Sequence, residues 1–407
     1  MFLHLVDDEK FTDGSADLFE ACDPGNHRYV IVCSNNPAQF RYIKKTNVQI
    51  IRYESEEYRS LTQTLSDYTA VFVYSLFNKY HLDLVNKAPT EAVLVWFFGG
   101  GELLTTKKYW PTVMLPRTRL LYYKHRAIPW LKTNFYKYIN LLRQGKVIAL
   151  AQPLRKLMVS GRSPGDSALD THLEKAIARM DYIAPVIPED YEQLKKMVPC
   201  NAEIVNWNYS AGFSLCNMES WRVTGNNWLV GNASRYALNH IEMFRLLNKI
   251  KGHQGDVIVP LSYGDNELYK NDILRAGNHF FGKQFRPLLD YMPIEDYYAT
   301  IRTCSAAFFN TPRQHAMGNI IRVLYIGARV FLREENPGYQ FFKRYGAKVF
   351  SIQTDIPRTA ETIDVPLDMT TIQQNRNAIV RIASEQVLQD KTLRMLTILK
   401  ERLNAKK

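Results

Sequence analysis

Residues 313–337 read RQHAMGNIIRVLYIGARVFLREENP and combine a loop, a helix and a short buried strand. We expect the helix to begin at Gly318 or Asn319 and to end at Gly327, with the strand over residues 329–332. A glycine at the start of a helix lets the backbone approach a ligand closely, and the unpaired N–H groups of the first turn favour an anion. Residues 316–319 therefore indicate a phosphate-binding loop, a pattern that they share with ordinary structural turns.

The composition is that of a globular protein with room for two domains. The chain has 407 residues, of which 46% are hydrophobic and 23% charged, unlike a disordered protein. It has no run of 18 apolar residues, so we expect no membrane span. Acids follow the apolar start MFLHLV at once, which favours a first strand over a signal peptide. The five cysteines have no C-x-x-C spacing, which is typical of core thiols in a cytoplasmic protein.

One segment carries the excess of positive charge. The formal net charge is +12, yet no acidic residue occurs between Glu102 and Asp166. Residues 109–138 interleave Lys and Arg with Trp and Tyr, as surfaces that meet anionic lipid headgroups do. Nucleic-acid-binding surfaces and ordinary solvated faces show similar mixtures. We expect residues 103–165 to face the membrane from the cytoplasmic side.

Apolar runs alternate with helical patterns through the first half of the chain. This alternation indicates an α/β fold with a doubly wound parallel sheet, in which ligands collect at the carboxyl ends of the strands. The runs expected to form the first strands cover residues 2–6, 29–34, 48–53, 70–74 and 92–98. The polar and glycine residues expected to line one crevice at these strand ends are Asp7, Asp8, Gly99, Gly100, Gly101 and Glu102.

A second alternating set begins near residue 227. We expect an N-terminal acceptor-binding domain over residues 1–212, a nucleotide-sugar-binding domain over residues 227–370, and C-terminal helices over residues 371–407 that pack back on them. Two Rossmann-like domains that face a central cleft, with a glycine-led helix late in the second, form the architecture called GT-B. A fold alone does not establish an activity.

Four stretches of the second half match the pattern of a known family. They are LVGNAS (229–234) with Asn239 and His240 just after it, VIVPLSYGDNELY (257–269), DYYATIRTCSAAFF (296–309) and residues 313–337. In these stretches the chain resembles the TDP-N-acetylfucosamine:lipid II N-acetylfucosaminyltransferases of enterobacterial common antigen synthesis, glycosyltransferase family 56. Two departures occur: Glu335 adds one acid to the family's Arg-Glu-Asn-Pro, and His315 and Val323 stand where many GT-B enzymes have glutamates.

The resemblance implies a hexosyltransferase. It implies a nucleotide-sugar donor (a dTDP- or UDP-sugar, with an acetamido-deoxyhexose as the sugar) and a saccharide on a polyprenyl diphosphate as the acceptor, in bacterial surface polysaccharide synthesis. It also implies a peripheral position on the inner face of the cell membrane and no nucleic-acid partner.

Such a transfer requires stabilisation of the leaving diphosphate and, if the reaction inverts, a general base for the acceptor hydroxyl. The chain has no Asp-x-Asp motif, so we expect no metal and no other cofactor. The candidate bases are Glu102 and Asp8, and Asp7 with Gly99, Gly100 and Gly101 would lie on the acceptor side. The candidate donor-binding residues are Gly231, Asn232, Arg235, Tyr263, Asn266, Tyr291, Arg313, His315, Met317, Gly318, Asn319, Glu335 and Asn336.

Two rival functions share some of these features. A non-hydrolysing sugar-nucleotide epimerase also has two Rossmann-like domains, but we expect it to lack a basic aromatic face. A nucleic-acid-binding protein could use the basic segment, and its binding would weaken steeply with salt. Both an inverting and a retaining transfer fit the sequence.

Overall fold

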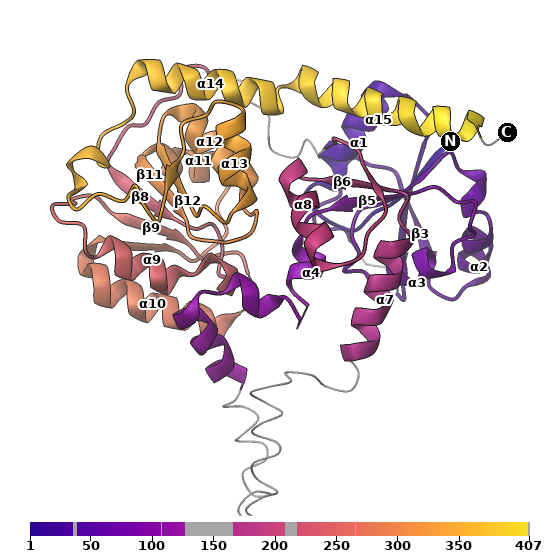
Figure 1. Ribbon diagram of the computed structural model, residues 1–407, viewed down its shortest axis with the longest axis horizontal. Helices are drawn as coiled ribbons and strands as arrows, with labels where there is room; N and C mark the ends of the chain where they lie inside the picture. The colour runs from indigo at the N-terminus through magenta and orange to yellow at the C-terminus, as the bar shows by residue number, and fades with distance from the viewer. Residues whose placement is uncertain (36–38, 107, 127–165, 208–217, 265, 406–407) are drawn as a thin grey trace, which may run out of the picture. The chain divides into compact units, whose positions relative to one another are not determined.

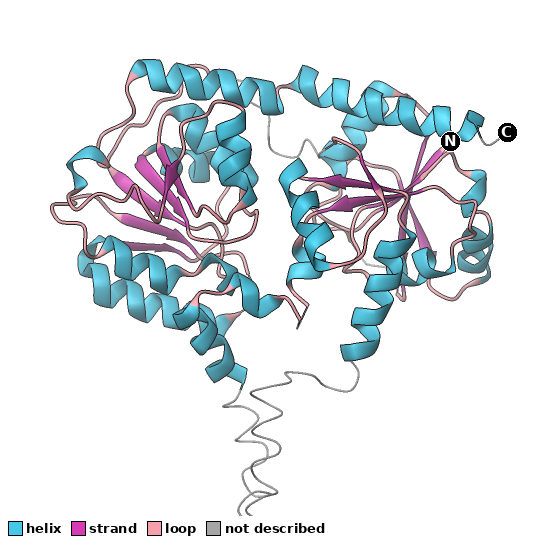
Figure 2. Ribbon diagram, in the orientation of Figure 1, coloured by secondary structure: helices cyan, strands magenta, loops and turns pink. Residues whose placement is uncertain are grey.

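The computed structural model describes residues 1–35, 39–106, 108–126, 166–207, 218–264 and 266–405. The chain forms two compact units. Within the described residues, the first unit holds residues 1–103, 168–207 and 379–405, and the second holds residues 104–126, 166–167 and 218–378. Each unit is a parallel sheet with helices on both faces (Figure 1, Figure 2).

The first sheet has the strand order β3-β2-β1-β4-β5-β6-β7. Its strands are β1 (Phe2–Leu5), β2 (His27–Cys33), β3 (Val48–Arg52), β4 (Val71–Val73), β5 (Leu94–Phe98), β6 (Tyr182–Pro185) and β7 (Glu203–Ile204). Its helices include α1 (Thr12–Cys22), α2 (Glu56–Gln63), α3 (Lys79–Lys87), α4 (Gly101–Leu104), α7 (Asp166–Arg179), α8 (Pro188–Met197) and α15 (Glu385–Ala405). The apolar runs form strands because both faces of a parallel sheet are covered by helices.

Helix α15 contributes to the core of the first unit although it lies far along the chain. Leu396 and Leu399 on this helix are buried in the same cluster as Phe97 and Trp207. The rings of Phe97 and Trp207 stack with centroids 4.0 Å apart, and the indole N–H of Trp207 donates to Oγ1 of Thr392 at 2.9 Å. This partner matters because a buried indole N–H without one destabilises the fold.

The second sheet has the strand order β10-β9-β8-β11-β12-β13, the 3-2-1-4-5-6 order of a Rossmann domain. Its strands are β8 (Asn227–Val230), β9 (Val257–Pro260), β10 (Phe285–Leu288), β11 (Cys304–Phe309), β12 (Arg329–Leu332) and β13 (Phe350–Ser351). Its helices include α9 (His240–Leu247), α10 (Glu267–Phe281), α11 (Ile294–Arg302), α12 (Met317–Ile326), α13 (Pro337–Arg344) and α14 (Met369–Ala383). The strand order reverses between the parallel neighbours β8 and β11, and such a switch point is where these sheets bind ligands.

The described part of the basic segment groups with the second unit, whereas the sequence predicts it in the first. The backbone N–H groups of Arg117 and Thr118 donate to Oε1 of Glu242 at 2.8 and 2.9 Å, and the Thr118 hydroxyl donates to its Oε2 at 2.6 Å. A carboxylate at a helix N-terminus is stabilising, so Glu242 caps the helix over residues 116–126. The prediction was wrong because it assigned the segment to the domain that precedes it in sequence. The residue that caps its helix lies 124 positions away from Thr118.

Other expected features fall outside the described residues. These are residues 107 and 127–165 of the basic segment and residues 208–217 of the connection between the domains. Among the described helices, none combines the length and the apolar composition that a membrane span requires.

Candidate donor and acceptor sites

The expected phosphate-binding loop lies at the carboxyl edge of the second sheet, between β11 and α12. Helix α12 begins at Met317, and Ala316 before it has a φ of +60°. An alanine in this region is strained, and such strain is concentrated at functional sites. The turn is therefore made by Ala316, while Gly318 lies inside the first helical turn. The ten-residue helix presents its first-turn N–H groups at this edge, as an anion site requires.

A glycine turn after β8 faces this loop. Gly231 has a φ of +68°, and a Cβ at this position would lie 2.8 Å from Nε2 of His240. Only glycine fits there. The next side chain, Asn232, places its Oδ1 3.0 Å from Nδ1 of His315, so the turn after β8 and the loop before α12 are joined by a hydrogen bond between two predicted donor-binding residues.

A cation from the segment after β8 and an aromatic ring from the turn after β9 lie side by side. The Arg235 guanidinium lies 5.2 Å from the ring centroid of Tyr263, and 45% of Tyr263 is exposed. Asn266 has a structural role, because its Oδ1 accepts the N–H of Tyr269 at 2.8 Å and so caps α10. Tyr291 lies between β10 and α11 and is 85% exposed, so it is open to a ligand.

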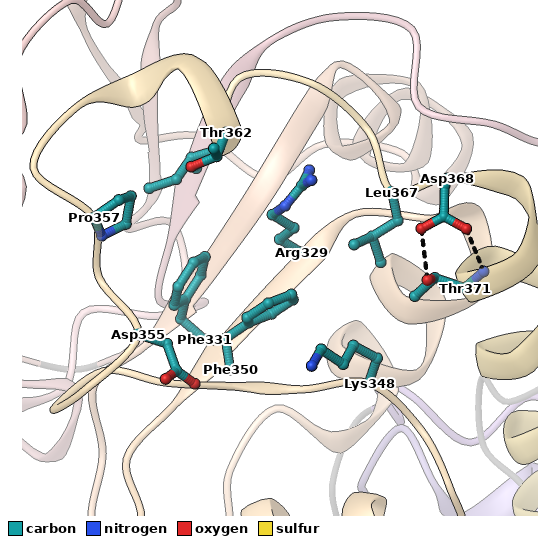
Figure 3. Close-up of a pocket in the computed structure, with 11 residues that line it drawn as sticks. Arg329, Phe331, Lys348, Phe350, Asp355, Pro357, Thr362, Leu367, Asp368 and Thr371 are labelled. Carbon is teal, nitrogen blue, oxygen red and sulfur yellow. Dashed lines mark hydrogen bonds between the residues drawn. The ribbon is translucent and has the colours of Figure 1, made fainter.

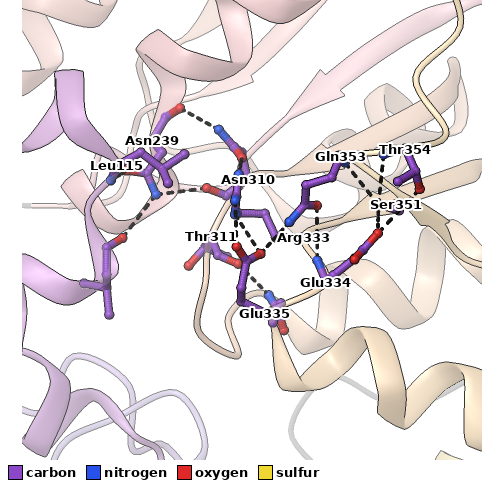
Figure 4. Close-up of polar contacts among 12 residues, drawn as sticks. Leu115, Asn239, Asn310, Thr311, Arg333, Glu334, Glu335, Ser351, Gln353 and Thr354 are labelled. Carbon is purple, nitrogen blue, oxygen red and sulfur yellow. Dashed lines mark hydrogen bonds and ion pairs between the residues drawn. The ribbon is translucent and has the colours of Figure 1, made fainter.

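Residues after β12 brace the same edge (Figure 4). Arg333 pairs with Glu335 at 2.9 Å and donates to Oδ1 of Asn310 at 3.3 Å. Partial burial alone would raise the pKa of Glu335, but the Arg333 hydrogen bond and charge outweigh it and lower the pKa. Asn336 donates to the carbonyl oxygens of Thr311 and Arg313 at 3.0 and 2.8 Å. Asn336 thus holds the loop that precedes α12, while Glu335 positions Arg333.

Asn239 connects this edge to the basic segment, and we did not predict it as a site residue. It has a φ of +50°, and its Nδ2 donates to the carbonyl oxygens of Val113 and Asn310 at 3.2 and 3.0 Å. Its Oδ1 accepts the N–H of Leu115 at 2.7 Å. In the sequence, Asn239 stands out only because it follows the family-matching stretch LVGNAS. That position does not reveal which residues Asn239 contacts.

In the first unit, Asp7 and Asp8 follow β1 and the three glycines follow β5, at the carboxyl edge expected for them. Asp8 accepts backbone N–H groups from three consecutive residues, Arg41, Tyr42 and Ile43, at 2.6, 2.9 and 3.0 Å. Partial burial would raise its pKa, but these donors lower it. Asp8 therefore anchors a loop, and a carboxylate stabilised in its charged form is a weak base.

Asp7 and Glu102 have different surroundings. Oδ1 of Asp7 accepts from Nδ2 of Asn78 at 2.7 Å, and its Oδ2 lies 3.9 Å from Nδ1 of the buried His81. Glu102 is 6% exposed in α4. Gly100 before it has a φ of +77°, so the glycine turn directs the chain from β5 into this short helix. Of the two predicted bases, Asp8 is engaged by three backbone N–H groups, and the role of Glu102 stays a prediction.

Comparison with known proteins agrees with this architecture. Residues 213–394 match the model of a family described as 4-alpha-L-fucosyltransferase glycosyl transferase group 56, which confirms the resemblance seen in the sequence. The chain is a glycosyltransferase.

Solved structures share the fold of this glycosyltransferase at low sequence identity. A glycosyltransferase from Rickettsia africae ESF-5 superposes with a TM-score of 0.60 and 12% identity over 99% of this chain and 98% of that one. Sucrose-phosphate synthase from Thermosynechococcus elongatus gives 0.59 and 8%, over 99% of each chain. Anabaena HepE in complex with UDP-glucose gives 0.57 and 10%, over 97% and 99%. The GT-B fold expected for the glycosyltransferase is confirmed.

Proposed function

We propose that the protein transfers an acetamido-deoxyhexose from a dTDP- or UDP-sugar to a saccharide on a polyprenyl diphosphate, during bacterial surface polysaccharide synthesis at the inner face of the cell membrane. The match to group 56 supports the sugar class, and HepE, which has the same fold, was solved with UDP-glucose.

The hydrogen bond between Asn232 and His315 carries the donor side of this proposal. It holds the glycine turn against the start of α12, so one diphosphate can accept N–H groups from Met317, Gly318 and Asn319. Negative charge grows on the diphosphate as the glycosidic bond breaks, and fixed donors stabilise that charge. Arg235 and Arg313 add cations, and the exposed Tyr263 and Tyr291 provide faces for the base or sugar. The proposal includes no metal.

The acceptor side belongs to the carboxyl edge of the first sheet. If the reaction inverts, Glu102 removes the proton of the acceptor hydroxyl while that oxygen attacks the anomeric carbon and the diphosphate leaves. Glu102 is 6% exposed and lies in α4, directly after the glycine turn at the carboxyl end of β5.

The helix over residues 116–126 supports a membrane-bound acceptor. Leu120 and Tyr123 lie three residues apart on one helical face and are 70% and 39% exposed. The exposed basic residues around them are Arg117, Arg119, Lys124 and Arg126. Apolar side chains flanked by cations suit a surface of anionic headgroups.

A thermal-shift panel of dTDP, UDP, GDP and their sugars tests the function. A ligand that binds the folded state raises the melting temperature by mass action. We expect one nucleoside diphosphate to stabilise the protein, with the shift reduced in Gly318→Ala and lost in Gly318→Val, while the melting temperature without ligand stays within about 2 °C of the wild type. No shift with any nucleotide would contradict the donor site.

A further inference from the structure

A separate hollow lies away from the donor and acceptor edges (Figure 3). It has a volume of about 320 Å³. Its lining consists of Arg329, Phe331, Lys348, Phe350, Asp355, Pro357, Thr362, Ile363, Leu367, Asp368 and Thr371. Arg329 is the first residue of β12, and Lys348 precedes β13. Since the strands are parallel, these cations lie at the amino edge of the sheet, opposite the phosphate-binding loop.

The floor of the hollow is formed by phenylalanine rings that lie in a row across adjacent strands. Phe308, Phe331 and Phe350 come from the adjacent strands β11, β12 and β13, with ring centroids 4.8 and 5.2 Å apart. Phe308 and Phe331 are buried, whereas Phe350, on the edge strand, is only half-buried. A planar group stacked on Phe350 would continue the row past the last strand.

The hollow has two cations and two carboxylates, so its formal charges balance, and the hydrogen bonds that each group already makes distinguish them. Both carboxylates are already engaged: Asp355 accepts from Ser351 N–H at 2.7 Å and from the Thr354 hydroxyl at 3.1 Å, and Asp368 caps α14 by accepting from Thr371 N–H at 2.9 Å and its hydroxyl at 2.7 Å. Each of the four carboxylate oxygens therefore already accepts one hydrogen bond from the protein.

The two cations, Arg329 and Lys348, still have N–H groups that can donate to a ligand. Arg329 donates through Nη1 to the carbonyl oxygen of Val365. Burial lowers its pKa, and the nearby charge of Asp368 acts in the opposite direction. The ammonium of Lys348 lies 5.4 Å from the ring centroid of Phe350, and within the described residues no ion pair joins either cation to a carboxylate. Phe350 lies between these cations in Figure 3.

The wall of the hollow is held in place by backbone hydrogen bonds. The N–H of Leu367 donates to the carbonyl oxygen of Gly327 at 3.2 Å, and Ala360 N–H donates to that of Lys251 at 2.9 Å. These bonds tie the loop after β13 to two other parts of the unit, so the hollow is preformed. Small-molecule sites are usually preformed in this way.

We propose that this hollow is a second ligand site, which binds a planar aromatic or heteroaromatic ring bearing a carboxylate or phosphate. The ring stacks on Phe350, and the anionic group lies between Lys348 and Arg329. The site is independent of the donor loop, so its test does not depend on the proposed transfer reaction.

The test is a ligand-observed NMR titration of the full chain with phenyl phosphate. We expect a Kd on the order of 1 mM, as suits a ligand of this size. Lys348→Met should weaken binding about fivefold by removing the charge, and Phe350→Leu about threefold by removing the stacked ring. Lys343→Met is the matched control, because Lys343 is also exposed and lies 5.1 Å from a ring centroid, that of Tyr339, outside the hollow. It should leave the Kd unchanged.

Two further measurements decide whether phenyl phosphate binds in the hollow and whether its negative charge is required. Binding should persist in Gly318→Val, which alters the donor loop, and benzylamine, with the opposite charge, should not bind. The proposal is overturned if phenyl phosphate fails to bind at about 10 mM, if the Lys348 and Lys343 variants bind equally, if benzylamine binds as well, or if Gly318→Val abolishes binding. Melting temperatures of the variants near that of the wild type show that each remains folded.

Discussion

Nδ1 of His315 lies 3.0 Å from Oδ1 of Asn232, and this pair joins two loops that are 83 residues apart in sequence. Asn232 follows β8 and His315 precedes α12, so the hydrogen bond sets the distance between a glycine turn and a helix N-terminus. The geometry of the proposed diphosphate site depends on this pair.

Removal of either partner should weaken donor binding by similar amounts. Asn232→Ala and His315→Ala should each raise the Kd of the preferred nucleoside diphosphate about tenfold, since each releases one loop. Calorimetric titration of both variants and of the double variant measures the coupling. The double variant should lose little more than either single variant; fully additive losses would show that the two side chains act separately.

Glu102→Gln should reduce turnover without reducing donor affinity. If Glu102 is the base of an inverting transfer, kcat should fall at least about 100-fold, which is the usual contribution of general-base catalysis. Asp8→Asn is the contrasting variant, because Asp8 anchors residues 41–43. It should lower the unfolding free energy by about 1–2 kcal/mol at neutral pH and change kcat little. A kcat for Glu102→Gln close to wild type would remove it as the base.

Charge reversal on the basic helix should release the protein from anionic vesicles. Arg119→Glu with Lys124→Glu changes two exposed residues beside Leu120 and Tyr123. Each cation near an anionic surface contributes about 1 kcal/mol, so reversing two should weaken vesicle binding more than tenfold in sedimentation assays. Lys249→Glu with Lys283→Glu alters two exposed residues of the same unit outside this helix and should bind like the wild type. Equal binding by both double variants would contradict the assigned surface.

His240 should make the protein less stable as the pH falls. Burial lowers its pKa to about 3, compared with about 6.5 in an unfolded chain. Between these values the unfolded state binds more protons, so the unfolding free energy falls with decreasing pH, by up to about 1.4 kcal/mol per pH unit for this group. Urea unfolding from pH 7 to pH 4 should show a smaller slope for His240→Gln than for the wild type. The exposed His279→Gln is the control and should keep the wild-type slope.

The sheet strands could be predicted because parallel strands between helices are continuous apolar runs. The expected strand at residues 48–53 is β3 (Val48–Arg52), and the strand at residues 329–332 is β12 with the same bounds. Asp7, Asp8 and Glu102 could be placed at one sheet edge for the same reason. What the sequence could not show is the role of each carboxylate, which depends on partners such as the N–H of Arg41, 33 residues from Asp8.

The remaining differences also come from distant partners. The helix over residues 116–126 belongs to the second unit because Glu242 and Asn239 bind its start, and nothing in the basic segment itself indicates those residues. The positive φ of Ala316 was not foreseen because alanine rarely adopts it. The hollow beside Phe350 depends on the loop after β13, whose sequence has no regular pattern.

The place of α15 in the first unit affects how the protein folds as it is synthesised. The strands of the first sheet all precede residue 205, yet their buried cluster includes Leu388, Met395, Leu396 and Leu399 from α15. The second unit is complete in sequence before α15 emerges. Although N-terminal domains usually fold first during synthesis, we expect the first unit here to keep an uncovered apolar face until α15 has been synthesised. We therefore expect truncation before α15 to expose that face to chaperones, while the second unit still folds.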